Sequence, residues 1–182
     1  MDATTDVIST TNQTETQCEI QCEDPVYPLS SKWVLWYHAV DDPNWTLEGY
    51  TKLPAISTLE EYHGMMNSLP DISAGMFFLM KEGIPPLWED PANKKGGYWS
   101  FRIQKLDCNT VWSELTAALI GESLTTRPAY MSYINGVSFS PKITNAIVRI
   151  WLSDNRKNNI KTMIVDDIPG LSISDAQFNR YN

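Results

Sequence analysis

Cysteine, histidine and long apolar runs are scarce in this sequence, and each shortage excludes a class of protein. The 182 residues include two histidines and three cysteines, Cys18, Cys22 and Cys108. Three cysteines are too few for a disulfide scaffold, and no second Cys or His pair completes a zinc site with Cys18 and Cys22. No apolar run approaches the roughly 20 residues of a membrane span, and no secretory signal is evident. We therefore expect free thiols in a reducing compartment and no metal site.

Positive charge is also scarce, above all near the N-terminus. The net charge is −8, and residues 1–24 contain six acidic residues without a single Lys or Arg. Subtracting these six charges leaves a net charge of −2 on the remaining residues, which argues against binding a polyanion through a broad positive field. A few well-placed cations could still hold one short anionic group. Because residues 1–24 also have few large apolar side chains, we expect a disordered acidic arm there and one folded domain at residues 25–182.

The folded region alternates between segments typical of strands and segments typical of helices. Apolar periodicity predicts strands at residues 32–40, 75–83, 97–106, 129–139, 145–153 and 176–181, and helices at residues 57–69, 111–122 and 154–168. Ser57 and Glu60 are spaced as a capping box for the first helix, and Gly121 stands where the second helix should end. This order predicts an α+β fold, a single domain with a mostly antiparallel sheet and three helices packed on one face. The other face would be free to bind a ligand.

Tryptophan is abundant, with seven residues, and two of them stand in unusual surroundings. Five lie inside predicted strands or helices and are expected in the core: Trp33, Trp36, Trp99, Trp112 and Trp151. Trp45 and Trp88 lie instead in the proline-containing loops "DDPNWTLEG" and "EGIPPLWED", where helix and sheet are blocked. Two loop indoles can grip a flat ring from both sides, and the carboxylate of Glu89 stands beside the second one. His38, at the end of the first strand, is expected to have no special chemistry.

Several stretches resemble the translation initiation factor 4E family, which binds the 7-methylguanosine cap of mRNA. They are "WVLWY", "NW", "EGIPPLWEDPANKKGGYW" and "VWSELTAALIGES". The resemblance covers residues 25 to about 168, all seven tryptophans fall where the family has its own, and the family's eighth falls at His63. The resemblance implies a curved sheet with helices on its convex face and a cap slot on its concave face. It also implies a binding protein, not an enzyme, that needs no cofactor.

The resemblance assigns cap-binding roles to the two loop tryptophans and to three further residues. Trp45 and Trp88 would stack on the methylated base, whose positive charge adds cation–π attraction to the stacking. Glu89 would accept hydrogen bonds from the guanine N1–H and amino group, and Trp151 would contact the N7 methyl group. The backbone N–H of Trp88 would donate to guanine O6.

The phosphate-binding residues of the family are only partly present. Lys142 matches the family's Arg, while Thr144 and Ile147 stand where the family has lysines. Arg149, Lys94 and Lys95 could contribute, but the sequence does not place them. We therefore expect weaker triphosphate binding than in a typical member, with a log–log salt slope of about −1 or less in magnitude.

The family binds its partners on the helical face, through a short helix laid in a groove. The matching positions are Pro28, Leu59, His63, Ser113 and Glu114. Pro28, Leu59 and Glu114 keep the family's residue types, whereas His63 replaces a Trp and Ser113 replaces a Leu. We therefore expect an ordinary peptide of the factor 4G type to bind poorly, and the partner to be a specialised one.

Four interpretations remain open from the sequence. The leading one is a cap-binding protein that links capped mRNA to the translation machinery in the cytoplasm, with the nucleus as a further location. The others are a repressor or storage protein that holds caps, an adaptor that has lost cap binding, and a lectin-like module. Sugar-binding sites also use loop tryptophans and carboxylates, but they do not require Glu89 beside Trp88.

Overall fold

A computed structural model describes residues 25–163 and 168–181, and the predicted disordered arm at residues 1–24 lies outside this range. Seven strands form one antiparallel sheet in the order β2-β1-β3-β5-β6-β4-β7. The strands are β1 (Pro28–His38), β2 (Thr51–Thr58), β3 (Met76–Lys81), β4 (Gly97–Gln104), β5 (Ile134–Pro141), β6 (Asn145–Leu152) and β7 (Gln177–Arg180). The helices are α1 (Leu59–Ser68), α2 (Cys108–Ile120) and α3 (Ile160–Met163). Short 3-10 turns connect several of these elements. The predicted α+β architecture is confirmed.

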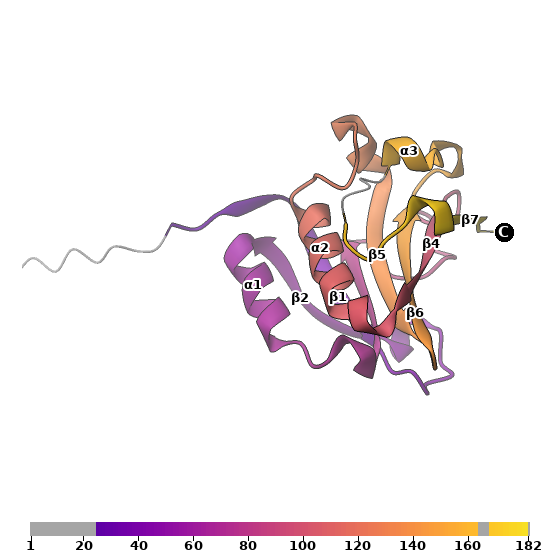
Figure 1. Ribbon diagram of the computed structural model, residues 1–182. Helices are drawn as coiled ribbons and strands as arrows, with labels where there is room; N and C mark the ends of the chain where they lie inside the picture. Colours follow the sequence, from indigo (N-terminus) through magenta and orange to yellow (C-terminus); the bar gives the residue numbers. More distant parts are fainter. Residues whose placement is uncertain (1–24, 164–167, 182) are drawn as a thin grey trace, which may run out of the picture.

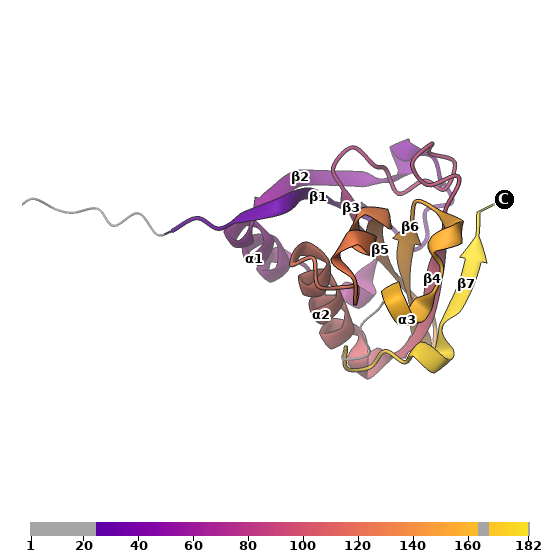
Figure 2. The same cartoon turned by 90° about the horizontal axis from the view of Figure 1, so that it is seen from above.

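The helices lie on one face of the curved sheet, and the core is sandwiched between them (Figures 1 and 2). Alternation along β1 shows how the sequence builds two faces. Trp33 and Leu35 pack into the large core beside the helices, while Val34 and Trp36 join a smaller cluster on the opposite face. Because successive strand side chains point to opposite faces, one strand supplies both clusters. The smaller cluster forms the floor of the open face.

The start of α1 differs from the prediction by one residue. The N-cap is Thr58, whose side chain accepts from the Glu61 backbone N–H, while the Glu61 carboxylate accepts from the Thr58 backbone N–H. Ser57 does not cap because α1 begins at Leu59, which makes Thr58 the residue directly before the helix, although the Ser57 hydroxyl also donates to Glu61 at 2.9 Å. Glu60, the predicted partner of Ser57, instead accepts from the Tyr27 backbone N–H. The capping box is therefore Thr58–Glu61, not Ser57–Glu60.

Strand β2 was not predicted, because Pro54 in its middle argues against a central strand. The sheet order resolves this conflict, since among the described strands β2 lies at the edge and pairs with β1 alone. A proline at an edge costs no ladder hydrogen bond when its missing N–H would face away from the partner.

Two predicted elements are shorter than expected. The strand expected at residues 129–139 begins with a 3-10 turn at Pro128–Tyr133, and β5 starts only at Ile134. The helix expected at residues 154–168 is a 3-10 turn at Asn155–Lys157 followed by the four-residue α3, with residues 164–167 outside the described range. Asn159 divides it, because its side chain accepts from the Lys161 backbone N–H and starts a new turn.

Candidate functional site

A cavity of about 570 Å³ opens on the face of the sheet that the helices leave free. Its walls come from the loop before β2, from the loop between β3 and β4, and from strands β3 to β7. The residues that line it include Trp45, Tyr50, Phe78, Trp88, Glu89, Tyr98, Lys142, Arg149, Trp151, Arg180 and Tyr181. All five residues predicted for the ligand site, Trp45, Trp88, Glu89, Trp151 and Lys142, thus lie around one cavity. The fold brings them together from segments more than 100 residues apart.

Trp45 presents one ring face to the cavity, because His38 covers the other. The two rings are stacked, with centroids 4.3 Å apart and planes at 9°. His38 is fully buried, and its ring nitrogens lie 2.7 Å from the Ala39 carbonyl oxygen and 2.9 Å from the Asn44 carbonyl oxygen. The indole itself remains 55% exposed. Sequence reasoning missed this supporting role of His38.

The loop that carries Trp88 and Glu89 is held by two buried asparagines. The Asn93 side-chain amide donates to the carbonyls of Pro85 at 3.1 Å and Leu87 at 2.8 Å. The Asn135 amide, on β5, donates in turn to the Asn93 side-chain oxygen at 2.8 Å. A loop whose carbonyls are satisfied in this way is fixed to the sheet, and the Trp88 side chain stays 47% exposed at its tip.

Glu89 adds negative charge to the cavity wall, and this charge affects the pKa of the neighbouring Tyr50. Burial raises the pKa of the Tyr50 phenol to about 12, and the negative charge of Glu89 adds to this shift while Arg149 opposes it. Tyr50 therefore stays neutral at physiological pH and packs edge-on against Phe78 with ring centroids 5.4 Å apart.

Trp151 forms the floor of the cavity in a fixed orientation. Its side chain is 5% exposed, and its indole N–H donates to the Ser138 hydroxyl at 2.9 Å. The rings of Phe78 and Tyr181 lie 6.2 Å and 5.6 Å from it. A buried indole with a satisfied N–H has little freedom to turn.

Three cationic side chains, Lys142, Arg149 and Arg180, line the cavity. The Arg149 guanidinium lies over the Tyr98 ring, 4.8 Å from its centroid, and its buried Nε has no hydrogen-bond partner among the described residues. Only Lys142 had been assigned a phosphate-binding role from the sequence. The pairing of β6 with β4 brings in Arg149, and the pairing of β7 with β4 brings in Arg180.

The predicted partner-binding residues are only partly brought together. Pro28, Leu59 and His63 line one hollow of about 390 Å³ on the helical side. Ser113 and Glu114 are exposed on α2 and do not line this hollow. Three of the five predicted residues therefore share one hollow, and two lie outside its lining.

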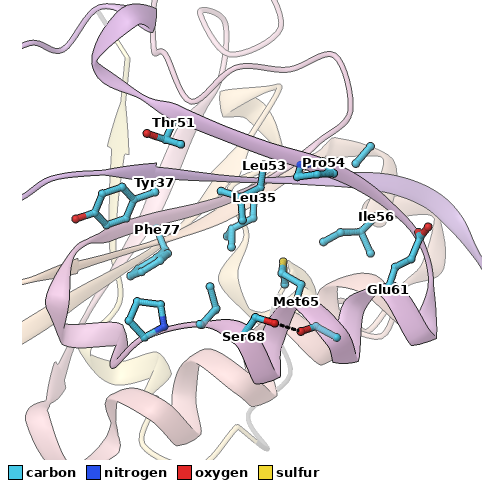
Figure 3. A pocket seen from close by; sticks show the side chains of 14 residues that line it. Leu35, Tyr37, Thr51, Leu53, Pro54, Ile56, Glu61, Met65, Ser68 and Phe77 are labelled. Atoms are coloured by element: carbon cyan, nitrogen blue, oxygen red, sulfur yellow. Dashed lines mark hydrogen bonds between the residues drawn. The ribbon is translucent and has the colours of Figure 1, made fainter.

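A second apolar hollow of about 660 Å³ lies between α1 and the strands β1 and β2 (Figure 3). Leu35, Leu53, Met65 and Phe77 converge on it, and Glu61 at its end is the one charged residue that lines it among those described. A lining of this kind suits apolar side chains.

The described residues contain no cluster of three or more His, Cys, Asp or Glu side chains that could hold a metal ion. None of the described helices is both long and apolar enough to cross a membrane. Cys108 is buried and has no disulfide partner among the described residues, and burial raises the pKa of its thiol. Cys18 and Cys22 lie outside the described residues.

Fold and cavity define a single-domain protein with one helix-covered face and one open, aromatic, ligand-sized cavity. The chain belongs to the eukaryotic translation initiation factor 4E family, whose sequence model, described as "Eukaryotic initiation factor 4E", matches residues 28–180. The translation initiation factor 4E of Candida albicans is 32% identical over 149 residues, which cover 75% of this chain and 69% of that protein. Across the curated relatives compared, the chain spans 56–76% of their length.

Solved structures show the same fold. The Caenorhabditis elegans protein eIF4E-3, in complex with the 4E-binding protein Mextli, is 25% identical with a TM-score of 0.67, covering 75% of this chain and 80% of that chain. The Ascaris suum protein eIF4E-3, in complex with an m2,2,7G cap, is 28% identical with a TM-score of 0.67, covering 75% of this chain and 78% of that chain.

Proposed function

We propose that this protein binds the 7-methylguanosine cap of mRNA and links capped mRNA to translation initiation partners. The observation that carries this proposal is the pair of half-exposed loop indoles, Trp45 and Trp88, on one cavity with the carboxylate of Glu89. Leaving two indoles exposed over a fixed floor is costly in water unless a ligand covers them. Membership of the family and the Ascaris relative, whose structure holds an m2,2,7G cap, support a ligand of the methylated-cap class.

The methyl group at N7 gives the guanine ring a delocalised positive charge. A cationic ring between two indole faces gains stacking and cation–π attraction, together about 1–3 kcal/mol for each stack. Unmethylated guanine keeps the stacking but loses the charge. The slot should therefore discriminate chiefly by methylation, with Trp151 in the floor beside the methyl group.

Glu89 supplies the base specificity in this proposal. Its two carboxylate oxygens can accept from N1–H and from the amino group of guanine, and such charge-assisted bonds are strong. Adenine presents no matching pair of donors on that edge. The Trp88 backbone N–H completes the recognition by donating to guanine O6.

The cationic side of the cavity would hold the triphosphate. Lys142 was assigned this role from the family pattern, and Arg149 and Arg180 line the same cavity. Arg149 can offer a bidentate fork to phosphate oxygens, which a lysine cannot.

Retention on immobilised 7-methyl-GTP tests the proposal. We expect the wild type to be retained and to elute with 7-methyl-GTP but not with GTP. Glu89→Gln should elute early, because an amide cannot accept both guanine donors, whereas the matched control Glu82→Gln, at an exposed residue, should behave as the wild type. Elution by GTP at the same concentration as 7-methyl-GTP would contradict the proposal.

We propose further that the helical face binds a partner of the factor 4G type or a specialised one, in the cytoplasm. Support comes from the hollow formed by Pro28, Leu59 and His63 and from the Mextli-bound C. elegans relative. A repressor or storage role stays the second candidate, because His63 and Ser113 weaken the apolar anchor. Wild type should bind a 4G-type peptide weakly, and the double variant His63→Trp, Ser113→Leu should bind it at least about tenfold tighter. Nanomolar binding by the wild type would contradict the specialised-partner proposal.

A further inference from the structure

A second, polar cavity of about 510 Å³ adjoins the same region of the sheet, beyond Arg149. Side chains of β4, β6 and the segment before β7 line it: Ser100, Arg102, Ile147, Ser174, Asp175, Ala176 and Gln177. Of these residues only Ile147 was named above, at a position where the family has a lysine. The cavity therefore requires its own explanation.

Strand register places the two cavities in line. Trp151 pairs with Tyr98, Arg149 with Ser100, and Ile147 with Arg102, so each step of two residues moves one row along the sheet. Ser100 and Arg102 alternate with Trp99, Phe101 and Ile103, which are buried in the helix-side core, and so they share the open face with Tyr98. These three paired rows, Trp151–Tyr98, Arg149–Ser100 and Ile147–Arg102, form a continuous track on the open face from the floor of the first cavity to the second cavity.

The spacing along this track suits the length of a capped RNA end. Strand residues rise about 3.3–3.4 Å each, so Arg149 lies roughly 7 Å and Ile147 roughly 13 Å from Trp151 along β6. A triphosphate leaving a base held over Trp151 would pass Arg149 within the first step. The nucleoside on its far side would then arrive beside Arg102 and Ser100.

The charges along the track are available for a ligand. Among the residues that the structure describes, the one salt bridge joins Arg156 to Asp154, so no described acid neutralises Arg102 or Arg149. Arg102 is exposed, and the buried Nε of Arg149 has no described hydrogen-bond partner. Asp175 is the one acidic residue in the lining of the second cavity.

We propose that the second cavity binds the first transcribed nucleotide of capped RNA, with Arg102 contacting the phosphate on its 3′ side. Ser100 and Gln177, which pair across β4 and β7, offer hydroxyl and amide groups to the ribose. No aromatic side chain lines this cavity among the described residues, so no stacking platform reads the base. Binding here is therefore independent of the identity of that base. The proposal rests on the proposed cap-binding function.

The test compares the affinities of two capped ligands that differ by one added nucleotide, m7GpppG and m7GpppGpG, by fluorescence titration at low salt. The wild type should bind the longer ligand about fivefold tighter, as one added phosphate contact with an arginine suggests. Arg102→Gln should remove this gain and leave the affinity for m7GpppG unchanged. The control Arg127→Gln, an exposed arginine after α2, should keep the full gain. Replacing the first transcribed G by A should change neither affinity.

The outcomes separate this inference from the proposed function. Equal wild-type affinities for the two ligands would overturn the second site while leaving cap binding intact. A gain that survives Arg102→Gln, or one that is lost equally in Arg127→Gln, would also overturn it. If the wild type binds neither capped ligand, the proposed function itself fails.

Discussion

The imidazole of His38 lies flat against the indole of Trp45, with ring centroids 4.3 Å apart. His38 is fully buried, and its ring nitrogens lie against the carbonyls of Ala39 and Asn44, so it acts as a fixed backing for an otherwise exposed ring. Tyr50 braces the same histidine edge-on at 4.8 Å. One wall of the proposed slot is therefore fixed in place before any ligand arrives.

Removing this backing should weaken cap binding without touching the ligand. Aromatic stacking contributes about 0.5–1.5 kcal/mol, so His38→Ala should weaken 7-methyl-GTP binding roughly two- to tenfold. His38→Phe keeps the stack but loses the carbonyl contacts, and should fall between wild type and His38→Ala. In a Trp45→Ala background, His38→Ala should have almost no further effect on affinity. Equal additive losses in both backgrounds would show that His38 acts on overall stability instead.

The buried Asn93 should control the wall opposite Trp45. Asn93→Ala removes the donor to the Pro85 and Leu87 carbonyls, and leaving such buried groups unpaired costs about 1–3 kcal/mol. We expect weaker 7-methyl-GTP binding and faster hydrogen exchange in the loop of residues 85–93. Asn145→Ala, at the start of β6, serves as the control and should alter neither measurement. Unchanged exchange in the loop of the Asn93 variant would contradict the role assigned to it.

Salt dependence should reveal the extra cations of the cavity. The sequence suggested one phosphate-binding cation, but Lys142, Arg149 and Arg180 line the cavity together. The log–log slope of 7-methyl-GTP affinity against salt should therefore be steeper than −1, and Arg149→Gln should reduce its magnitude by about 0.7–0.9. Arg127→Gln should leave it unchanged. A wild-type slope of about −1 that Arg149→Gln does not alter would show that Arg149 holds no phosphate.

Alkaline pH should destabilise the fold through Tyr50. Its pKa is raised from 10.0 to about 12 in the folded protein, chiefly by burial, so the folded state holds the phenol proton more tightly than the unfolded state. The stability from this proton is fully present below pH 10 and is lost as the pH rises from 10 to 12. Urea midpoints measured between pH 8 and pH 11 should fall, and less steeply in Tyr50→Phe. Burial also raises the pKa of Tyr181, so the variant should keep part of the decline.

The sequence predicted those parts of the fold that depend on local pattern. Alternation in β4, the aromatic and apolar residues of β1, β3 and β6, and periodicity in α1 and α2 identified these elements correctly. β2 was missed because Pro54 argues against a central strand, and the sequence does not show that this strand lies at the edge of the sheet. The cap of α1 shifted from Ser57 to Thr58 because β2 extends one residue further than the helix pattern suggests.

The residues of the candidate site likewise fall into those that the sequence predicted and those that it did not. Trp45, Trp88 and Glu89 stand out locally, since prolines exclude them from regular elements, and the family resemblance supplied Trp151 and Lys142. His38 gave no signal, because its stacking depends on how the loop after β1 folds back. Arg149 and Arg180 could not be placed, because strand pairing across the sheet decides which side chains face the cavity.

The most direct test of the account is a tryptophan-fluorescence titration with 7-methyl-GTP and with GTP, on wild type, Trp45→Ala and Trp88→Ala. The account predicts that the wild type binds the methylated nucleotide at least about tenfold tighter, because only that ring carries the positive charge between the indoles. Each variant should lose this preference. Equal, weak binding of both nucleotides by the wild type would contradict the cap slot and leave a protein-binding adaptor as the better explanation of the chain.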